Sequence, residues 1–192
     1  LQRLKTFVPQ LDELVDIFKN NWTLSLKNKG AGAITREDAM RLNVVGPFAR
    51  AAGLAIDVRN ETEDLLPWKA VGFEMVTDTT GDVYARNMVR LRELYVSIRM
   101  IQNIINGLPE SALVTETKAF PDGEAVVRLE APRGELFYYA KGNKTQMLER
   151  LKIKAPTFSN VAAMVEAFKG NEYGSVPAII ASYDPCLSCT SR

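Results

Sequence analysis

The sequence lacks histidine altogether and has only two cysteines among its 192 residues. Two cysteines are too few for a disulfide framework, so they leave a single bridge, a redox pair or a metal site, and they indicate a reducing compartment. A complete structural zinc site needs four ligands, usually cysteine and histidine. Two sulfurs and no imidazole do not provide such a site within one chain.

The sequence also lacks an excess of charge of one sign, because 24 Lys and Arg against 23 Asp and Glu give a formal net charge of +1. This balance gives no reason to expect nucleic acid or an anionic membrane as a direct partner. No apolar run reaches the roughly 18 residues of a membrane-spanning helix, since Pro47 and Arg50 interrupt the richest stretch, residues 44–56. The opening at Leu1 has no signal-peptide features and favours an internal start.

What the sequence does have is enough hydrophobic residues, 46%, for one sizeable core, and its length favours a single domain. Residues 1–120 are predicted to be helical. After Pro9, apolar residues recur at intervals of three and four residues, which predicts a helix that ends at Asn20. The glycine-containing segment 24–35 is predicted to be a loop.

The strongest pattern predicts one long central helix. Two short helices, opened by Thr35 and at Pro47, come before it. The long helix is expected to begin with Asp82 or Thr80 as its cap and to end at Gly107. Its apolar stripe consists of Tyr84, Met88, Leu91, Tyr95, Ile98, Ile101, Ile105 and Leu108.

After Pro121, apolar and polar residues alternate. Residues 121–155 are therefore predicted to form a small antiparallel sheet with strands at 124–131, 135–142 and 151–155. Residues 156–192 are expected to form a helix and a tail that contains C-x-x-C. The predicted fold class is therefore mainly α with a small sheet (α+β): a helical bundle with one long central helix and an antiparallel sheet.

The tail DPCLSC holds both cysteines, Cys186 and Cys189. A simple bridge is one interpretation of this pair. A thioredoxin-like pair would need the first thiol at the start of a substantial helix, and too few residues follow Cys186. The remaining interpretation is half of a soft-metal site, in which two thiolates need further ligands from elsewhere.

Five segments in order resemble the C-terminal part of a nickel-iron hydrogenase large subunit, of the energy-converting, membrane-bound type related to respiratory complex I. The DPCxxC tail followed by a basic residue, Arg192, is the most specific of these motifs, and PRGE upstream reinforces it. The segments are GPFARAAGLAIDVRNE, GDVYARNMVRLRELYVSIRMIQ, GEAVVRLEAPRGELFYY, KAPTFSN and VPAIIASYDPCLSCTSR.

The resemblance implies a nickel-iron centre, with carbon monoxide and cyanide on iron, held by four cysteines. Two come from an N-terminal C-x-x-C that is absent here, while Cys186 matches a terminal nickel ligand and Cys189 a bridging ligand. The fragment alone is expected to be inactive and metal-free. The implied partners are the missing N-terminal half, an iron-sulfur small subunit and, indirectly, membrane subunits at the cytoplasmic face; no nucleic acid is expected.

The resemblance also implies two polar groups at this centre. Arg133 matches an arginine that lies above the metals. The guanidinium group of that arginine hydrogen-bonds to a cyanide and polarises dihydrogen, while the Cys186 sulfur accepts the proton. Thr157 matches a hydroxyl that donates to the second cyanide. From the residues alone, a solvated turn arginine is the preferred interpretation of Arg133, and a helix N-cap is the alternative interpretation of Thr157.

Three more residues are expected beside the centre. Asp184 is predicted to orient Arg133, although it is also an ordinary residue before a proline. Pro132 precedes Arg133 in the PRGE motif. Tyr138 stands where many relatives have a histidine that positions a ligand.

A second function belongs to a different class: a non-catalytic scaffold, or quinone-module relative of complex I, with vestigial cysteines. Retention of both cysteines within DPCxxC favours the hydrogenase, because a scaffold does not need thiols.

Overall fold

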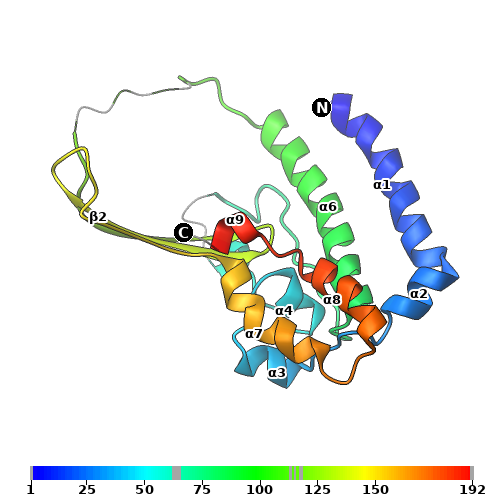
Figure 1. The fold of residues 1–192 in the computed structure, drawn as a ribbon. Coiled ribbons are helices and arrows are strands. Elements are labelled where there is room, and N and C mark those ends of the chain that lie inside the picture. Colours follow the sequence, from blue (N-terminus) through cyan, green and yellow to red (C-terminus); the bar gives the residue numbers. More distant parts are fainter. Residues whose placement is uncertain (1, 62–65, 113, 115, 117–118, 191–192) are drawn as a thin grey trace.

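The computed structural model describes residues 2–61, 66–112, 114, 116 and 119–190, and its fold is α+β (Figure 1). Arg192, which the sequence motif includes, lies outside these residues. The helices are α1 (Gln2–Asn20), α2 (Trp22–Asn28), α3 (Arg36–Arg41), α4 (Pro47–Ala51), α5 (Val58–Glu61), α6 (Val83–Asn106), α7 (Pro156–Phe168), the 3-10 turn η1 (Tyr173–Ser175), α8 (Val176–Tyr183) and α9 (Leu187–Thr190). The strands are β1 (Asp122–Ala131), β2 (Gly134–Asn143) and β3 (Arg150–Lys154). No helix among the described residues is both long and apolar enough to cross a membrane.

The N-terminal segment is more helical than its sequence predicts. Helix α1 begins before Pro9 and includes it, so the expected start after this proline is wrong, while the end at Asn20 is confirmed. Part of the predicted loop 24–35 is also wrong, because α2 continues through Asn28. The side chain of Asn21 accepts a hydrogen bond from the Leu24 amide and thereby caps α2, a signal that the sequence contained.

The core lies where α3, α4, α7, α8 and the first turn of α6 meet. Thr35 caps α3 as predicted, with its hydroxyl 3.0 Å from the Asp38 amide, and Pro47 is the first residue of α4. Small side chains allow these short helices to approach closely. The core residues are Ala31, Ile34, Ala39, Val44, Phe48, Ala49, Ala52, Leu54, Val83, Ala163, Ala167, Ile179 and Tyr183.

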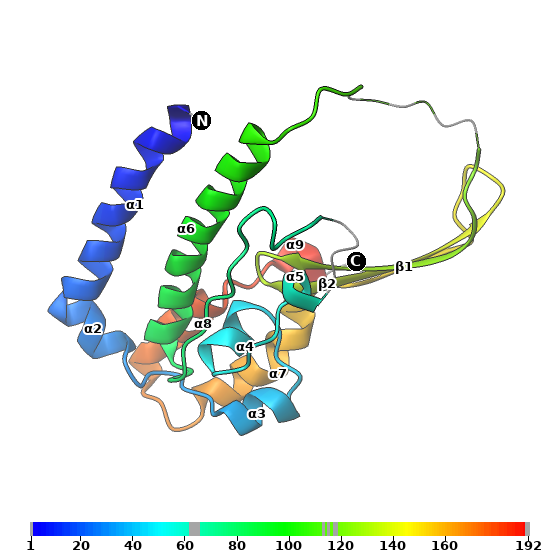
Figure 2. The ribbon, with the colours of Figure 1, turned by 180° about the vertical axis from the view of Figure 1, so that it is seen from behind.

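Helix α6 is the longest described helix, with 24 residues. Asp82 caps its start by accepting from the Ala85 amide at 2.7 Å, and Gly107 caps its end, as expected. Only the first part of its predicted apolar stripe is fully covered: Met88 is buried, whereas Ile105 is 45% exposed. Helix α1 runs beside α6 in both views (Figures 1 and 2).

The three predicted strands are confirmed as an antiparallel sheet in the order β1-β2-β3. The β1–β2 hairpin projects from the helical part of the molecule, and its turn at residues 132–133 lies against that part (Figure 2). Helix α7 follows β3 directly. Its N-cap is Ala155, so the interpretation of Thr157 as the helix N-cap is wrong.

Two glycines fix the hairpin turn against α4. Gly46, the N-cap of α4, has φ of +74°, and a Cβ atom there would lie 2.4 Å from the Gly134 Cα and 2.5 Å from the Arg133 carbonyl oxygen. Gly134 has φ of +126° and packs its backbone against the same residue. The close contact of the two backbones therefore determines where Arg133 lies.

We predict that Gly46→Ala destabilises the chain and displaces Arg133. The left-handed backbone alone costs an alanine about 1–2 kcal/mol, and the clash with Gly134 adds about 1–3 kcal/mol. Gly30→Ala is the matched control, because Gly30 has φ of +76° but a Cβ atom there would meet nothing within 4 Å. Urea unfolding that gives equal losses for both variants would contradict the role of the contact.

Candidate functional site

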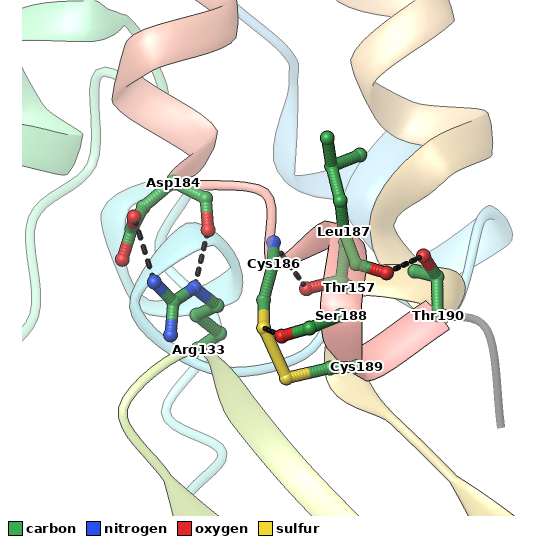
Figure 3. The surroundings of a disulfide bond; sticks show 8 residues. All are labelled: Arg133, Thr157, Asp184, Cys186, Leu187, Ser188, Cys189 and Thr190. Atoms are coloured by element: carbon green, nitrogen blue, oxygen red, sulfur yellow. Dashed lines mark hydrogen bonds and ion pairs between the residues drawn. A yellow bond between two sulfur atoms is a disulfide. The ribbon is translucent and has the colours of Figure 1, made fainter.

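The two cysteines lie at the C-terminal end of the described chain and are joined by a disulfide (Figure 3). Helix α8 ends at Tyr183, and Asp184 takes a left-handed backbone with φ of +52° that turns the chain toward Pro185. The single turn α9 brings the Cys186 and Cys189 Cα atoms within 5.3 Å of each other. Both sulfurs therefore point to one place, and reduction of the bridge is required before either can bind a metal.

Arg133 is held against the cysteine tail. Its Nη2 atom donates to Asp184 Oδ1 at 2.9 Å, and its Nε atom donates to the Asp184 carbonyl oxygen (Figure 3). The side chain is 29% exposed, so it is not the solvated turn arginine that the sequence alone allowed. Asp184 orients the guanidinium through two hydrogen bonds, which is the relation expected from the sequence.

Thr157 lies on the other side of the same tail. Its hydroxyl oxygen accepts a hydrogen bond from the Cys186 amide at 3.2 Å, and the residue is buried (Figure 3). Because Ala155 is the N-cap of α7, the hydroxyl does not cap this helix. It fixes the first cysteine instead, and its own hydrogen can be donated to a neighbouring group.

A pocket of about 240 Å³ brings the predicted residues together. Arg133, Thr157 and Cys189 line it, together with Pro132 and Tyr138. Cys186 and Asp184 reach this group through the hydrogen bonds to Thr157 and Arg133. The seven residues selected from the sequence therefore occupy one neighbourhood, although the sequence places them up to 57 positions apart.

Two buried arginines that sequence reasoning missed hold the end of α8. Arg86 is 0% exposed and donates to Ser182 Oγ at 2.9 Å and to the Gly32 and Gly81 carbonyl oxygens, and Arg90 donates to the Ser182 carbonyl oxygen. Burial without a carboxylate lowers the pKa of Arg86 to about 10. Their spacing of four, which places both on one face of the predicted long helix, was the available signal.

A second missed feature is the buried ion cluster around Arg50. This guanidinium is 1% exposed and lies 3.0 Å from Asp57, 2.8 Å from Glu93 and 2.8 Å from Glu130. Burial raises the pKa of Glu130, although the neighbouring Arg50 opposes the change. An arginine inside the apolar stretch 44–56 was the sequence signal, because a buried charge needs partners.

The donor set fits half of a soft-metal site. No group of three or more histidine, cysteine, aspartate or glutamate side chains in the described part of the chain is arranged to hold a metal ion. The reduced pair offers two thiolates, and Arg133, which lines the pocket with Cys189, offers a fixed positive charge that an anionic thiolate centre requires. The remaining ligands must come from outside these residues.

Comparison with known sequences matches the chain, over residues 1–119 and 111–192, to the family described as the respiratory-chain NADH dehydrogenase 49 kDa subunit. The carbon monoxide-induced hydrogenase of Rhodospirillum rubrum is 37% identical over 94% of this chain and 50% of its own length. The membrane-bound hydrogenase subunit alpha of Pyrococcus furiosus is 34% identical over 100% of this chain and 49% of its own length. An NADH-quinone oxidoreductase subunit of Solibacter usitatus is 32% identical over 98% of this chain and 51% of its own length.

A solved structure has the same fold. One chain of the membrane-bound sulfane sulfur reductase, an archaeal respiratory membrane complex, matches with a TM-score of 0.89 and 25% identity, over 98% of this chain and 53% of that chain. The α+β fold with its small sheet is thus that of subunits in such complexes. The chain spans about half the length of the relatives that it matches.

We predict that Thr157→Val loosens the cysteine tail, because the Cys186 amide loses its hydrogen-bond acceptor. Amide hydrogen exchange at Cys186 should accelerate by about fivefold to tenfold, as expected for a hydrogen bond worth about 1 kcal/mol. Thr157→Ser keeps the hydroxyl and serves as the control. Equal protection in the two variants would show that the hydroxyl does not fix the tail.

Proposed function

The chain belongs to the family of the 49 kDa subunit of the respiratory-chain NADH dehydrogenase, and on this premise we propose that it is the C-terminal half of the large subunit of an energy-converting nickel-iron hydrogenase. The family is one of oxidoreductase subunits, which include hydrogenases and quinone reductases. The proposed reaction is reversible oxidation of dihydrogen. The chain would contribute two of four cysteine ligands and would be inactive and metal-free by itself.

The observation on which the proposal depends is the arrangement of Cys186 and Cys189 beside Arg133. The Arg133 guanidinium and the Cys189 side chain line one pocket, and Asp184 and Thr157 hold the two sides of this arrangement through hydrogen bonds. A pair of sulfurs next to a fixed cation suits an anionic metal centre. The two hydrogenase relatives at 37% and 34% identity support the same assignment.

Each residue then has a defined task. Reduction of the disulfide with two electrons and two protons gives two thiols, which lose their protons when they bind a metal. The nickel-iron centre, when bound, supplies the redox chemistry that splits or forms dihydrogen. Arg133, which Asp184 holds in place, would supply a guanidinium group beside that centre, and the Cys186 Sγ atom would take up the proton. Thr157 keeps Cys186 in place and has its hydroxyl hydrogen available for a ligand of iron.

The uncovered apolar side chains near the site are consistent with the partners that we propose. Phe158 on α7 is 69% exposed and Leu187 on α9 is 79% exposed, although both lie close to the half-buried tail. Apolar surface of this kind is normally covered. We assign it to the other half of the subunit, which would also meet an iron-sulfur small subunit. The assembly would be peripheral to the cytoplasmic face of the membrane.

The scaffold alternative is supported by a separate observation. The quinone oxidoreductase relative is nearly as similar as the hydrogenases, at 32% identity, and both sulfurs of this chain are bonded to each other. In a non-catalytic scaffold or quinone-module relative, the bridge would be a static crosslink. Metal content of the intact protein distinguishes the two functions.

We predict that the full-length subunit contains nickel and iron and takes up dihydrogen, and that Arg133→Lys keeps the metals but slows uptake by about 100-fold or more. Lysine preserves the charge but loses the two-pronged contact with Asp184. Metal analysis and dihydrogen uptake are measured on the same samples. A full-length protein without nickel would establish the scaffold, and unchanged uptake in the variant would remove Arg133 from the mechanism.

We also predict that the isolated chain, although metal-free by itself, takes up added Ni²⁺ weakly and only after reduction of its disulfide. The reduced pair should give thiolate-to-nickel charge-transfer absorption, and the oxidised chain should not, because a disulfide sulfur is a poor ligand. Cys186→Ser and Cys189→Ser are the matched controls, and each should weaken Ni²⁺ binding by about tenfold or more. Equal binding by the oxidised chain would place the metal at other ligands.

A further inference from the structure

A second cavity, of about 340 Å³, adjoins the candidate site. Pro132 and Ala131 line both this cavity and the pocket that contains Cys189. Asp184, Glu130 and Glu93 also line the cavity. Its volume is large enough for several water molecules, each of which occupies about 30 Å³ in liquid water.

Arg90 provides evidence that the cavity is hydrated. This side chain lines the cavity and donates through Nη1 to the Arg86 and Ser182 carbonyl oxygens. Its Nε atom is shielded from bulk solvent and has no hydrogen-bond partner within the described chain. Buried guanidinium hydrogens are almost always bonded to protein or to water. A water molecule in the cavity would satisfy this donor.

Glu130 is a buried acid that lines the cavity. Its side chain is 4% exposed and accepts from Arg50 at 2.8 Å and from the Val58 amide at 3.3 Å. Asp57 and Arg59 on the α5 side face the same cluster, and Glu93 and Arg90 face it from α6. The guanidinium groups of Arg50, Arg59 and Arg90 therefore lie among three carboxylates, those of Asp57, Glu93 and Glu130.

We infer that this cavity is a hydrated proton-transfer route that links the surroundings of the Arg133–Asp184 pair to the carboxyl group of Glu130. The inference deepens the proposed function and rests on it, because dihydrogen chemistry releases and consumes protons beside Arg133. Burial raises the pKa of Glu130 and so favours proton capture there. The candidate site itself gives this carboxylate no other task.

The transfer needs no electron donor or acceptor. A proton released at the site joins the first cavity water, and each water passes one proton on as it receives another. The last water gives its proton to a Glu130 oxygen, and the resulting carboxylic acid later returns it to water at the cavity rim, where Leu94 is 39% exposed. Asp184 keeps its bonds to Arg133 throughout.

A crystal structure of the chain tests the hydration directly. We expect an ordered water within hydrogen-bond distance of Arg90 Nε and further waters that lead toward Glu130. A cavity that is dry, or that neighbouring side chains fill, would overturn the route.

Infrared titration of the chain tests whether Glu130 carries the proton. We expect a protonated-carboxyl band that persists above the ordinary glutamate pKa of about 4.3 and that disappears in Glu130→Gln. Glu124→Gln is the matched control, because Glu124 lies in the same strand but is exposed.

The pH dependence of stability gives a second test of Glu130. The free energy of unfolding should fall as pH rises from the ordinary glutamate pKa through the raised pKa of Glu130, since the folded state holds this proton more tightly. Glu130→Gln should remove this dependence on pH. A band and slope that are unchanged in Glu130→Gln would overturn the assignment.

The assembled hydrogenase provides the kinetic test. Glu130→Gln should slow dihydrogen uptake by about 100-fold, as expected for loss of a proton carrier, with nickel content unchanged and with a larger solvent deuterium isotope effect. Ser97→Leu, which fills the cavity without removing a carboxylate, should have the same two effects, whereas Glu124→Gln should have neither. Normal uptake in both cavity variants would overturn the route alone. Absence of nickel from the assembled protein would instead overturn the proposed function, and the route's catalytic purpose with it.

Discussion

The contact between Arg133 and Asp184 joins two segments that are 51 residues apart, and the candidate site depends on it. The hairpin turn brings the guanidinium, and the end of α8 brings the carboxylate and carbonyl oxygens. Neither segment fixes itself: Gly46 and Gly134 hold the turn against α4, and Arg86 and Arg90 hold the end of α8. The site is therefore rigid on both sides before any metal or partner arrives.

The charges around the tail explain why the cysteines need this scaffold. Arg86 and Arg90 are buried without a bound carboxylate, so the end of α8 lies in a positive environment. Arg133 adds a further positive charge, and its guanidinium group forms an ion pair with one carboxylate, that of Asp184. Fixed positive charge of this kind is the natural counter-charge for an anionic metal centre, which the reduced pair would help to bind in the proposed function.

Local signals in the sequence were sufficient for most elements but not for the packing between them. The strands, the Thr35 cap and the Asp82 cap follow from short-range chemistry, and the structure confirms them. Pro9 misled the prediction, because a proline early in a long helix loses only one backbone hydrogen bond and neighbouring turns preserve the rest. Thr157 had the right residue type for a cap but lies two positions too late, and its hydroxyl bonds to a segment 29 residues away.

The clusters around Arg50 and Arg86 could not be found from local patterns, because their partners come from distant elements. Arg50 meets Glu130 from a strand 80 residues further along, and Arg86 meets Ser182 from a helix 96 residues away. A charged residue in an apolar segment signals that a partner exists, but pattern alone does not identify it. Only the resemblance to a family placed Arg133, Thr157 and the cysteines together beforehand.

The exposed apolar residues of α6 indicate a contact with a segment outside the described residues. Its apolar stripe continues beyond the buried Ile98, yet Ile101 is 42% exposed and Ile105 is 45% exposed. A solvent-facing helix has no physical reason to keep apolar residues at this spacing over so many turns. The same is true of Val165 on α7, which is 53% exposed. The periodicity is therefore better explained by a surface that a companion segment covers, and the proposed nickel-iron centre would need the same companion for its other two sulfur ligands.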